Sequence, residues 1–257
     1  MRLPVESLPY FVFAATIFGL VIGSFLNVCI YRIPRNISVN GNHGRSMCRD
    51  CGVILKWYDL VPLISYCILR GKCRWCKAPI SARYPLVEFL NAVLWGACAW
   101  FFKETIHALI YAILCSVLLV LSFIDWDTQE IPYRFQGIIL GLGLLSLFLS
   151  DFPSIKERVI GMFIISVPMV ILTLLLNGFG GGDIQLMTVS GFLLGYRANV
   201  IAMIIGTLLA ALLGIIVMRR EKGDKRTKIP FGPFLAIGLV CALFWGESIY
   251  NWYFRLF

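Results

Sequence analysis

Long uncharged, mostly apolar segments alternate along this chain with short segments that carry its charge. Several of the uncharged segments reach the roughly 20 residues that a helix needs to cross a bilayer. The second and the sixth are short, so they need flanking residues or a protected interior. The pattern predicts an all-α polytopic membrane protein with about eight transmembrane helices. The uncharged segments are residues 7–31, 89–102, 105–124, 135–150, 159–182, 184–196, 198–218 and 229–246.

The composition agrees with this prediction and excludes a soluble globular protein. Of the 257 residues 59% are hydrophobic and 14% are charged, whereas about a quarter of the residues in an average soluble domain are charged. The first uncharged segment is long, only Arg2 precedes it, and strong basic charge follows at Arg32 and Arg35. We therefore expect a retained membrane span with its N-terminus outside, rather than a cleaved signal peptide.

The basic residues predict the orientation of the chain. With eight alternating spans, seventeen of the 23 Lys and Arg residues fall in inner loops, as the excess of positive charge in cytoplasmic loops requires. The net charge of +9 is therefore read as loops lying next to anionic membrane lipid. Binding of nucleic acid is not expected, because the charge follows the side of the membrane so closely.

Two acidic residues end up at the same predicted depth. Asp125 ends the third span within IDWDTQEIP, and Asp183 follows the fifth span within NGFGGGD, 58 positions later. A carboxylate near the hydrocarbon is costly, so two at one level need a reason. One explanation is structural, with Asp183 capping the sixth helix and Asp125 lying in the headgroup layer. The other explanation is a catalytic pair.

The neighbouring residues favour the catalytic pair. Gly180, Gly181 and Gly182 let the backbone turn sharply and let another segment approach closely, and Pro132 marks a helix boundary beside the first acid. Two carboxyl groups in a partly dry site cannot both ionise easily, so one keeps the proton while the other activates water, as in aspartic proteases. Asp127 shares the turn of Asp125 and could tune it, although a solvated loop residue is the simpler interpretation.

Two pairs of cysteines lie in the first inner loop. Cys48 and Cys51 form one CxxC pair, Cys73 and Cys76 form the other, and 21 residues separate the pairs. This spacing is typical of a tetrahedral zinc site with four thiolate ligands. Disulfides or a redox function are the alternatives, but the loop is predicted to face the reducing cytoplasm. Four protein thiolates leave no open position on the ion, so the zinc is expected to be structural. The five other cysteines, Cys29, Cys67, Cys98, Cys115 and Cys241, are interpreted as small buried apolar residues.

Together these segments resemble the type IV prepilin peptidases, or leader peptidases, over nearly the whole chain and in the same order. The motifs are FGLVIGSFLNVCIYRIPR (18–35), the two CxxC pairs, RYPLVE (83–88), IDWDTQEIP (124–132), GGGD (180–183) and IPFGPFLAIG (229–238). The resemblance implies an eight-span intramembrane aspartyl protease of the GxGD type in the bacterial inner membrane. It implies cleavage of the short basic leader of type IV pilin or pseudopilin precursors at the cytoplasmic face. It also implies methylation of the new N-terminus, usually phenylalanine, with S-adenosylmethionine.

Carried onto this sequence, the family's two catalytic aspartates fall on Asp125, seven positions before Pro132, and on Asp183 of GGGD. Two departures from the family pattern are Gln185, where relatives commonly have lysine, and Tyr133, where they have aspartate or asparagine. Neither departure removes a catalytic carboxylate. No residue can be assigned to the methyl donor, because the inner loop has no glycine-rich nucleotide motif.

The small and polar residues of GSFLNV and RYPLVE have no chemical function that the sequence reveals. Gly23, Ser24 and Asn27 are interpreted as packing contacts between spans, whereas Glu88 at the inner end of the second span is the best further functional candidate. The expected organisation is a first transmembrane helix (1–31), a cytoplasmic zinc-binding domain (32–84) and a transmembrane peptidase core (85–257). Two other classes remain open, namely a proton-coupled carrier and an inert assembly factor that binds partners through the zinc loop.

Overall fold

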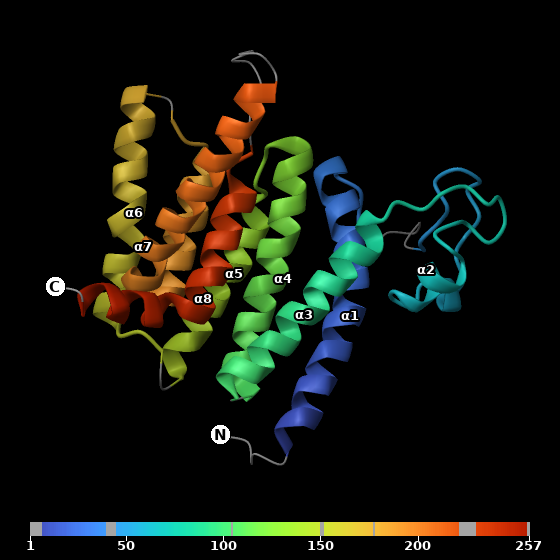
Figure 1. Ribbon diagram of the computed structural model, residues 1–257, viewed down its shortest axis with the longest axis horizontal. Helices are drawn as coiled ribbons and strands as arrows, with labels where there is room; N and C mark the ends of the chain where they lie inside the picture. Colours follow the sequence, from blue (N-terminus) through green and yellow to red (C-terminus); the bar gives the residue numbers. More distant parts are fainter. Residues whose placement is uncertain are drawn as a thin grey trace. The chain divides into compact units, whose positions relative to one another are not determined.

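The computed structural model describes residues 7–39, 45–103, 105–149, 152–176, 178–220 and 230–255. These residues form helices and irregular segments, and the only strand-like pairs among them are two isolated bridges, Met47 with Ile54 and Lys72 with Pro79. The predicted all-α fold is confirmed (Figure 1). The helices are α1 (Leu8–Arg32), α2 (Ile64–Ile68), α3 (Arg83–Phe102), α4 (Thr105–Thr128), α5 (Tyr133–Leu145), α6 (Ile155–Leu176), α7 (Gly181–Arg220) and α8 (Gly232–Phe254).

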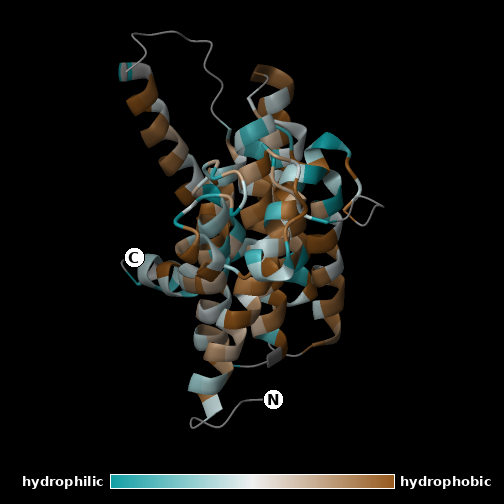
Figure 2. Ribbon diagram, turned by 90° about the vertical axis from the view of Figure 1, so that its right-hand side faces the viewer, coloured by the Kyte–Doolittle hydropathy of each residue, from teal (hydrophilic) through white to brown (hydrophobic). Residues whose placement is uncertain are grey.

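Six of these helices, α1, α3, α4, α6, α7 and α8, are long and apolar enough to cross a membrane. Figure 2 shows apolar residues along the helices, while the hydrophilic residues gather mainly in the connecting segments. The fourth predicted span corresponds to α5, which is only 13 residues long. The chain is therefore a multi-pass membrane protein, while the count of eight spans stays a prediction.

The sixth and seventh uncharged segments run together as α7, which is interrupted at Gly195. The φ of Gly195 is 80°, in the region that favours glycine. The Asn199 side-chain amide donates to the Met187 carbonyl over 3.1 Å. In a straight helix, residues 12 positions apart would be about 18 Å apart. The chain therefore turns back at Gly195, so the two segments pack on each other near the turn.

The chain forms two compact units, Met1–Val120 and Leu121–Phe257. In the first unit, α1 and α3 approach closely at glycines. A Cβ on Gly19 would lie 2.8 Å from the Trp95 Cβ, and one on Gly23 would lie 2.8 Å from the Glu88 Cα. The Asn91 amide donates to the Gly19 carbonyl over 2.7 Å. Gly23 is thus a packing residue, in agreement with the interpretation from the sequence.

In the second unit, a buried arginine joins three helices. Arg158, at the start of α6, is 1% exposed. Its guanidinium donates to the Gly143 and Ser146 carbonyls at the end of α5 and to the Phe192 carbonyl on α7. Carbonyls at a helix C-terminus carry partial negative charge and lack helical partners, so they stabilise the buried cation.

The α1–α3 contact generates a stability prediction. Gly19→Ala should lower the thermal unfolding midpoint, because overpacking a tight contact typically costs about 1–3 kcal/mol. Gly137→Ala, on α5 with no heavy atom within 4 Å of the added Cβ, should leave the midpoint equal or higher, because alanine favours helix by about 1 kcal/mol. Equal midpoints for both variants in the same detergent would contradict the close packing.

Candidate active site and metal centre

Asp125 lies near the C-terminal end of α4 and is buried, at 5% exposure. Its Oδ2 accepts a hydrogen bond of 2.9 Å from the backbone N–H of Gly232, the first residue of α8. The N-terminus of a helix carries partial positive charge, which favours an anionic group beside it. A Cβ on Gly232 would lie 2.7 Å from the same oxygen, so this approach requires glycine.

Asp183 lies in the first turn of α7 and is half-buried. It is near enough to Asp125 for the two carboxyl groups to interact electrostatically. The Asp183 N–H donates to the Gly180 carbonyl over 3.1 Å, which closes the turn that starts the helix. The structure thus brings together two acids that are 58 positions apart in the sequence.

The glycine loop, residues 180–182, packs against α5 and the segment before that helix. A Cβ on Gly182 would lie 2.8 Å from the Ile131 Cβ, and the buried Gln136 side chain donates to the Gly182 carbonyl over 3.1 Å. Pro132 is the N-cap of α5, so it sets where this helix begins. Gly181 has open space around it. Close packing therefore explains the glycine at position 182 and does not explain the one at position 181.

Asp127 is exposed, in contrast to Asp125. The rings of Phe179 and Phe231 lie 5.5 Å apart, centroid to centroid, so the segment before α7 contacts the segment before α8. Reasoning from the sequence missed Gly232 and Gln136. The only signal for Gly232 was its place in the motif IPFGPFLAIG, and Gln136 had no signal.

The four predicted cysteine ligands converge within the first unit. All four sulfur atoms lie within 4.8 Å of one another, and the Cys48 and Cys76 sulfurs are 3.8 Å apart. A tetrahedral zinc ion with Zn–S bonds of about 2.3 Å separates its sulfur ligands by about 3.8 Å. The cluster therefore fits a zinc ion.

The two CxxC turns have matching backbones. In each turn the N–H of the first cysteine, Cys48 or Cys73, donates to the carbonyl five residues later, over 2.9 and 2.8 Å. The residue after the second cysteine has positive φ in both, 69° at Gly52 and 59° at Lys77. The backbone N–H groups of Cys76 and Trp75 lower the pKa of the Cys73 thiol to about 7, which favours its thiolate form. Burial and hydrogen bonds with the other three thiols raise the pKa of Cys76 to about 12.

Glu88 connects this loop to the membrane helices. It is 9% exposed, and its Oε2 accepts a hydrogen bond of 2.9 Å from the Leu63 N–H at the start of α2. The Ser24 side chain on α1 lies close enough to influence this carboxyl group. These contacts give Glu88 an architectural function. Of the five remaining cysteines, Cys29, Cys98 and Cys115 are buried as expected, Cys241 is half-buried, and Cys67 is exposed, contrary to expectation.

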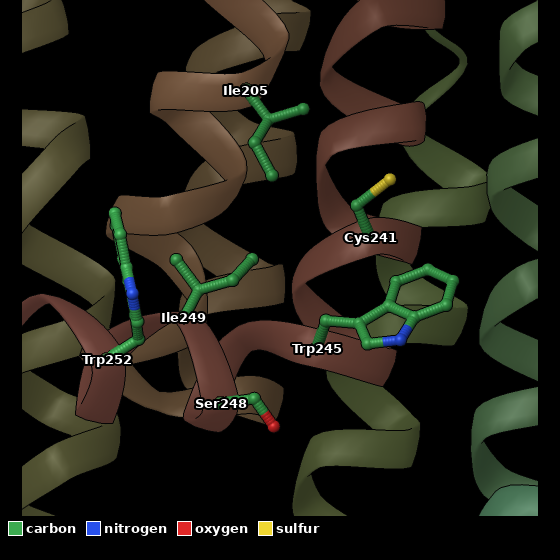
Figure 3. A pocket seen from close by; sticks show the side chains of 6 residues that line it. All are labelled: Ile205, Cys241, Trp245, Ser248, Ile249 and Trp252. Carbon is green, nitrogen blue, oxygen red and sulfur yellow. The ribbon is translucent and has the colours of Figure 1, made fainter.

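A shallow hollow of about 450 Å³ lies between the second segment of α7 and α8 (Figure 3). Its lining contains none of the predicted catalytic or metal-binding residues, and apart from Cys241 and Ser248 it consists of large apolar side chains. The hollow is lined by Ile205, Cys241, Trp245, Ser248, Ile249 and Trp252. The two acids that the sequence singles out, Asp125 and Asp183, therefore lie outside this hollow.

Comparisons with known proteins agree with the motifs. Residues 17–102 match the bacterial peptidase A24 N-terminal domain, and residues 112–215 match the type IV leader peptidase family. A protein from Aeromonas hydrophila called prepilin leader peptidase/N-methyltransferase is 36% identical, over 98% of this chain and 97% of its own. The chain belongs to the type IV leader peptidase family.

Proteins of the same name from Legionella pneumophila and Pseudomonas aeruginosa are each 33% identical over 95% of this chain. They are covered over 95% and 94% of their own lengths. The family match spans both Asp125 and Asp183, and the match to the N-terminal domain spans the four clustered cysteines. No solved structure matches this chain.

The cysteine cluster generates a metal-binding prediction. Purified protein should contain a single zinc ion per chain, and Cys48→Ser should lose it, because three thiolates hold the ion far less tightly than four. Cys67→Ser is the matched control and should keep the ion. Elemental analysis after gel filtration measures both, and equal zinc content in the two variants would rule out the cluster as the site.

Proposed function

We propose that the chain is a prepilin leader peptidase that also methylates the new N-terminus of its product, with Asp125 and Asp183 as the catalytic pair. The observation that carries the proposal is that these two carboxyl groups, at helix ends within one compact unit, lie near enough to interact electrostatically. A proton-coupled carrier is disfavoured, because its acids would lie along a path deep in the membrane. An inert assembly factor would not need the pair.

In the proposed reaction one carboxyl group of the pair is protonated and the other is ionised. The ionised group takes a proton from a water molecule, whose oxygen attacks the scissile carbonyl carbon, while the protonated group hydrogen-bonds the carbonyl oxygen. The tetrahedral intermediate then collapses, the C–N bond breaks, and the amine leaves with a proton from the pair. The Gly232 N–H, donating to Asp125 over 2.9 Å, fixes the orientation of this carboxyl group.

The remaining residues of the site are proposed to support the pair. Gly180 and Gly182 let the chain carry Asp183 inward, and Pro132 starts α5, whose Gln136 holds the glycine loop. Asp127 is exposed on the turn after Asp125, so we assign it a modulating influence at most. Gln185 is also exposed. A lysine at this position, as is common in relatives, would therefore lie at the surface and is not needed to balance a buried charge.

The proposed substrates are type IV prepilins or pseudopilins. A basic leader would stay in the cytoplasm while the apolar helix behind it lies in the bilayer. The junction between leader and helix would then lie near the membrane surface, at the level proposed for the helix ends that carry Asp125 and Asp183. We therefore propose the bacterial inner membrane as the location, with the pair and the cysteine loop facing the cytoplasm. The positive loops predict this orientation.

Methyl transfer is proposed from the names of the relatives, prepilin leader peptidase/N-methyltransferase. S-adenosylmethionine is the proposed donor, and its residues are unassigned. The proposed zinc is structural. Cys48, Cys51, Cys73 and Cys76 would hold it, and with four thiolates it would stabilise the loop without offering an open position to substrate.

Cleavage of a prepilin by the purified protein tests the pair directly. Asp125→Asn and Asp183→Asn should each lower kcat by at least about 10³-fold, since asparagine keeps the shape and loses the proton exchange. Asp127→Asn should stay at least partly active. Full activity of either of the first two variants would refute the mechanism.

The Gly232 contact gives a second prediction about activity. Gly232→Ala should lower kcat/KM on the order of 10²-fold, because the added methyl group displaces Asp125 and small misplacements of catalytic groups cost about that much. The matched control is Gly141→Ala on α5, where the new Cβ meets nothing within 4 Å. If both variants cleave at the wild-type rate, the contact does not position the carboxyl group.

A further inference from the structure

An exposed apolar surface lies beside the cysteine cluster, where a soluble loop would be expected. On α2, Ile64 and Ile68 are 59% and 70% exposed, and the exposed Cys67 lies between them. Positions i, i+3 and i+4 share one face of a helix. Trp57 and Leu60, just before this helix, are 78% and 39% exposed. We refer to Trp57, Leu60, Ile64, Cys67 and Ile68 as the loop surface.

A hydrogen bond fixes the depth of this surface relative to the bilayer. The Leu63 N–H, at the N-cap of α2, donates to Glu88 on α3 over 2.9 Å. The candidate span Arg83–Phe102 has 20 residues, just enough to cover the roughly 30 Å of hydrocarbon, so Arg83 lies near its boundary. Glu88 is then about 7–8 Å farther along the helix, at 1.5 Å per residue. The start of α2 is therefore at or below the level at which α3 enters the membrane.

Charge flanks the apolar residues on both sides. Lys56 precedes Trp57, and Arg70 and Lys72 follow Ile68, all three exposed. Apolar and aromatic side chains with basic neighbours are typical of segments that lie in the interface of a bilayer containing anionic lipid. Tryptophan is enriched at this depth. The combination fits a lipid surface better than water.

We propose that the loop surface is embedded in the headgroup layer of the bilayer and anchors the cysteine loop to the membrane. The partner is the lipid interface itself, with anionic headgroups near the three basic residues. The proposal follows from the position of α2 against α3 and does not depend on the peptidase activity. It also explains the exposure of Cys67, which is a small apolar side chain facing lipid.

Cys67 offers a probe that the chain already contains. Full-length, zinc-loaded protein with Cys241→Ser is labelled with a nitroxide at Cys67 and placed in nanodiscs of mixed zwitterionic and anionic phospholipid. Electron paramagnetic resonance then compares the access of oxygen, which concentrates in lipid, with that of a water-soluble nickel complex. Two reference sites in the Cys67→Ser background are Ser38→Cys, exposed shortly after α1, and Val167→Cys, 47% exposed on α6.

The nitroxide at Cys67 should favour oxygen, as at the Val167 reference, and should lose this preference in the Ile64→Asp/Ile68→Asp variant. Purely zwitterionic nanodiscs should weaken the preference. Access matching the Ser38 reference would overturn the proposal, because the surface would then face water. The proposal would also be overturned if the nitroxide were shielded from the nickel complex only after a prepilin is added, since the partner would then be a protein.

Discussion

The hydrogen bond from the Gly232 N–H to Asp125 is the interaction on which the candidate site of this protein depends. It joins the C-terminal end of α4 to the N-terminus of α8, 107 positions later. A carboxyl group at 5% exposure needs such a partner, because an unpaired buried charge is expensive. The bond also requires glycine, since a Cβ at this position would lie 2.7 Å from the carboxyl oxygen.

Asp183 is positioned by contacts of the glycine that precedes it. Gly182 packs against Ile131, and Gln136 holds the carbonyl of the same glycine, so the start of α7 is fixed against the segment that follows Asp125. At the other end of α5 and of the first segment of α7, Arg158 gathers their free carbonyls. Helix α5 and the first segment of α7 are thus held at both ends, which limits the movement of Asp183 in the first turn of α7.

Much of this arrangement was predictable from the sequence, for identifiable reasons. Uncharged segments predict helices because an apolar environment leaves backbone groups no other partners, and CxxC spacing predicts a sulfur cluster because each pair spans one side of an ion. The contact of Gly232 with Asp125 could not be predicted from its motif, because a hydrogen bond between distant helix ends leaves no local pattern. The turn at Gly195 could not be predicted either, since a glycine within an apolar segment does not reveal whether the chain turns there. The exposure of Cys67 and the contacts of Glu88 depend on how α2 lies against α3, which composition does not reveal.

The central claim is that Asp125 and Asp183 act as one unit that shares a proton. The most direct measurement compares single-turnover cleavage of a prepilin by Asp125→Asn, Asp183→Asn and the double variant. Residues that act as a unit are strongly non-additive, so removing either one costs about as much as removing both. We predict that the double variant is within a few-fold of the slower single variant. A loss in the double variant equal to the product of the two single losses would contradict the account, because the two carboxyl groups would then contribute independently.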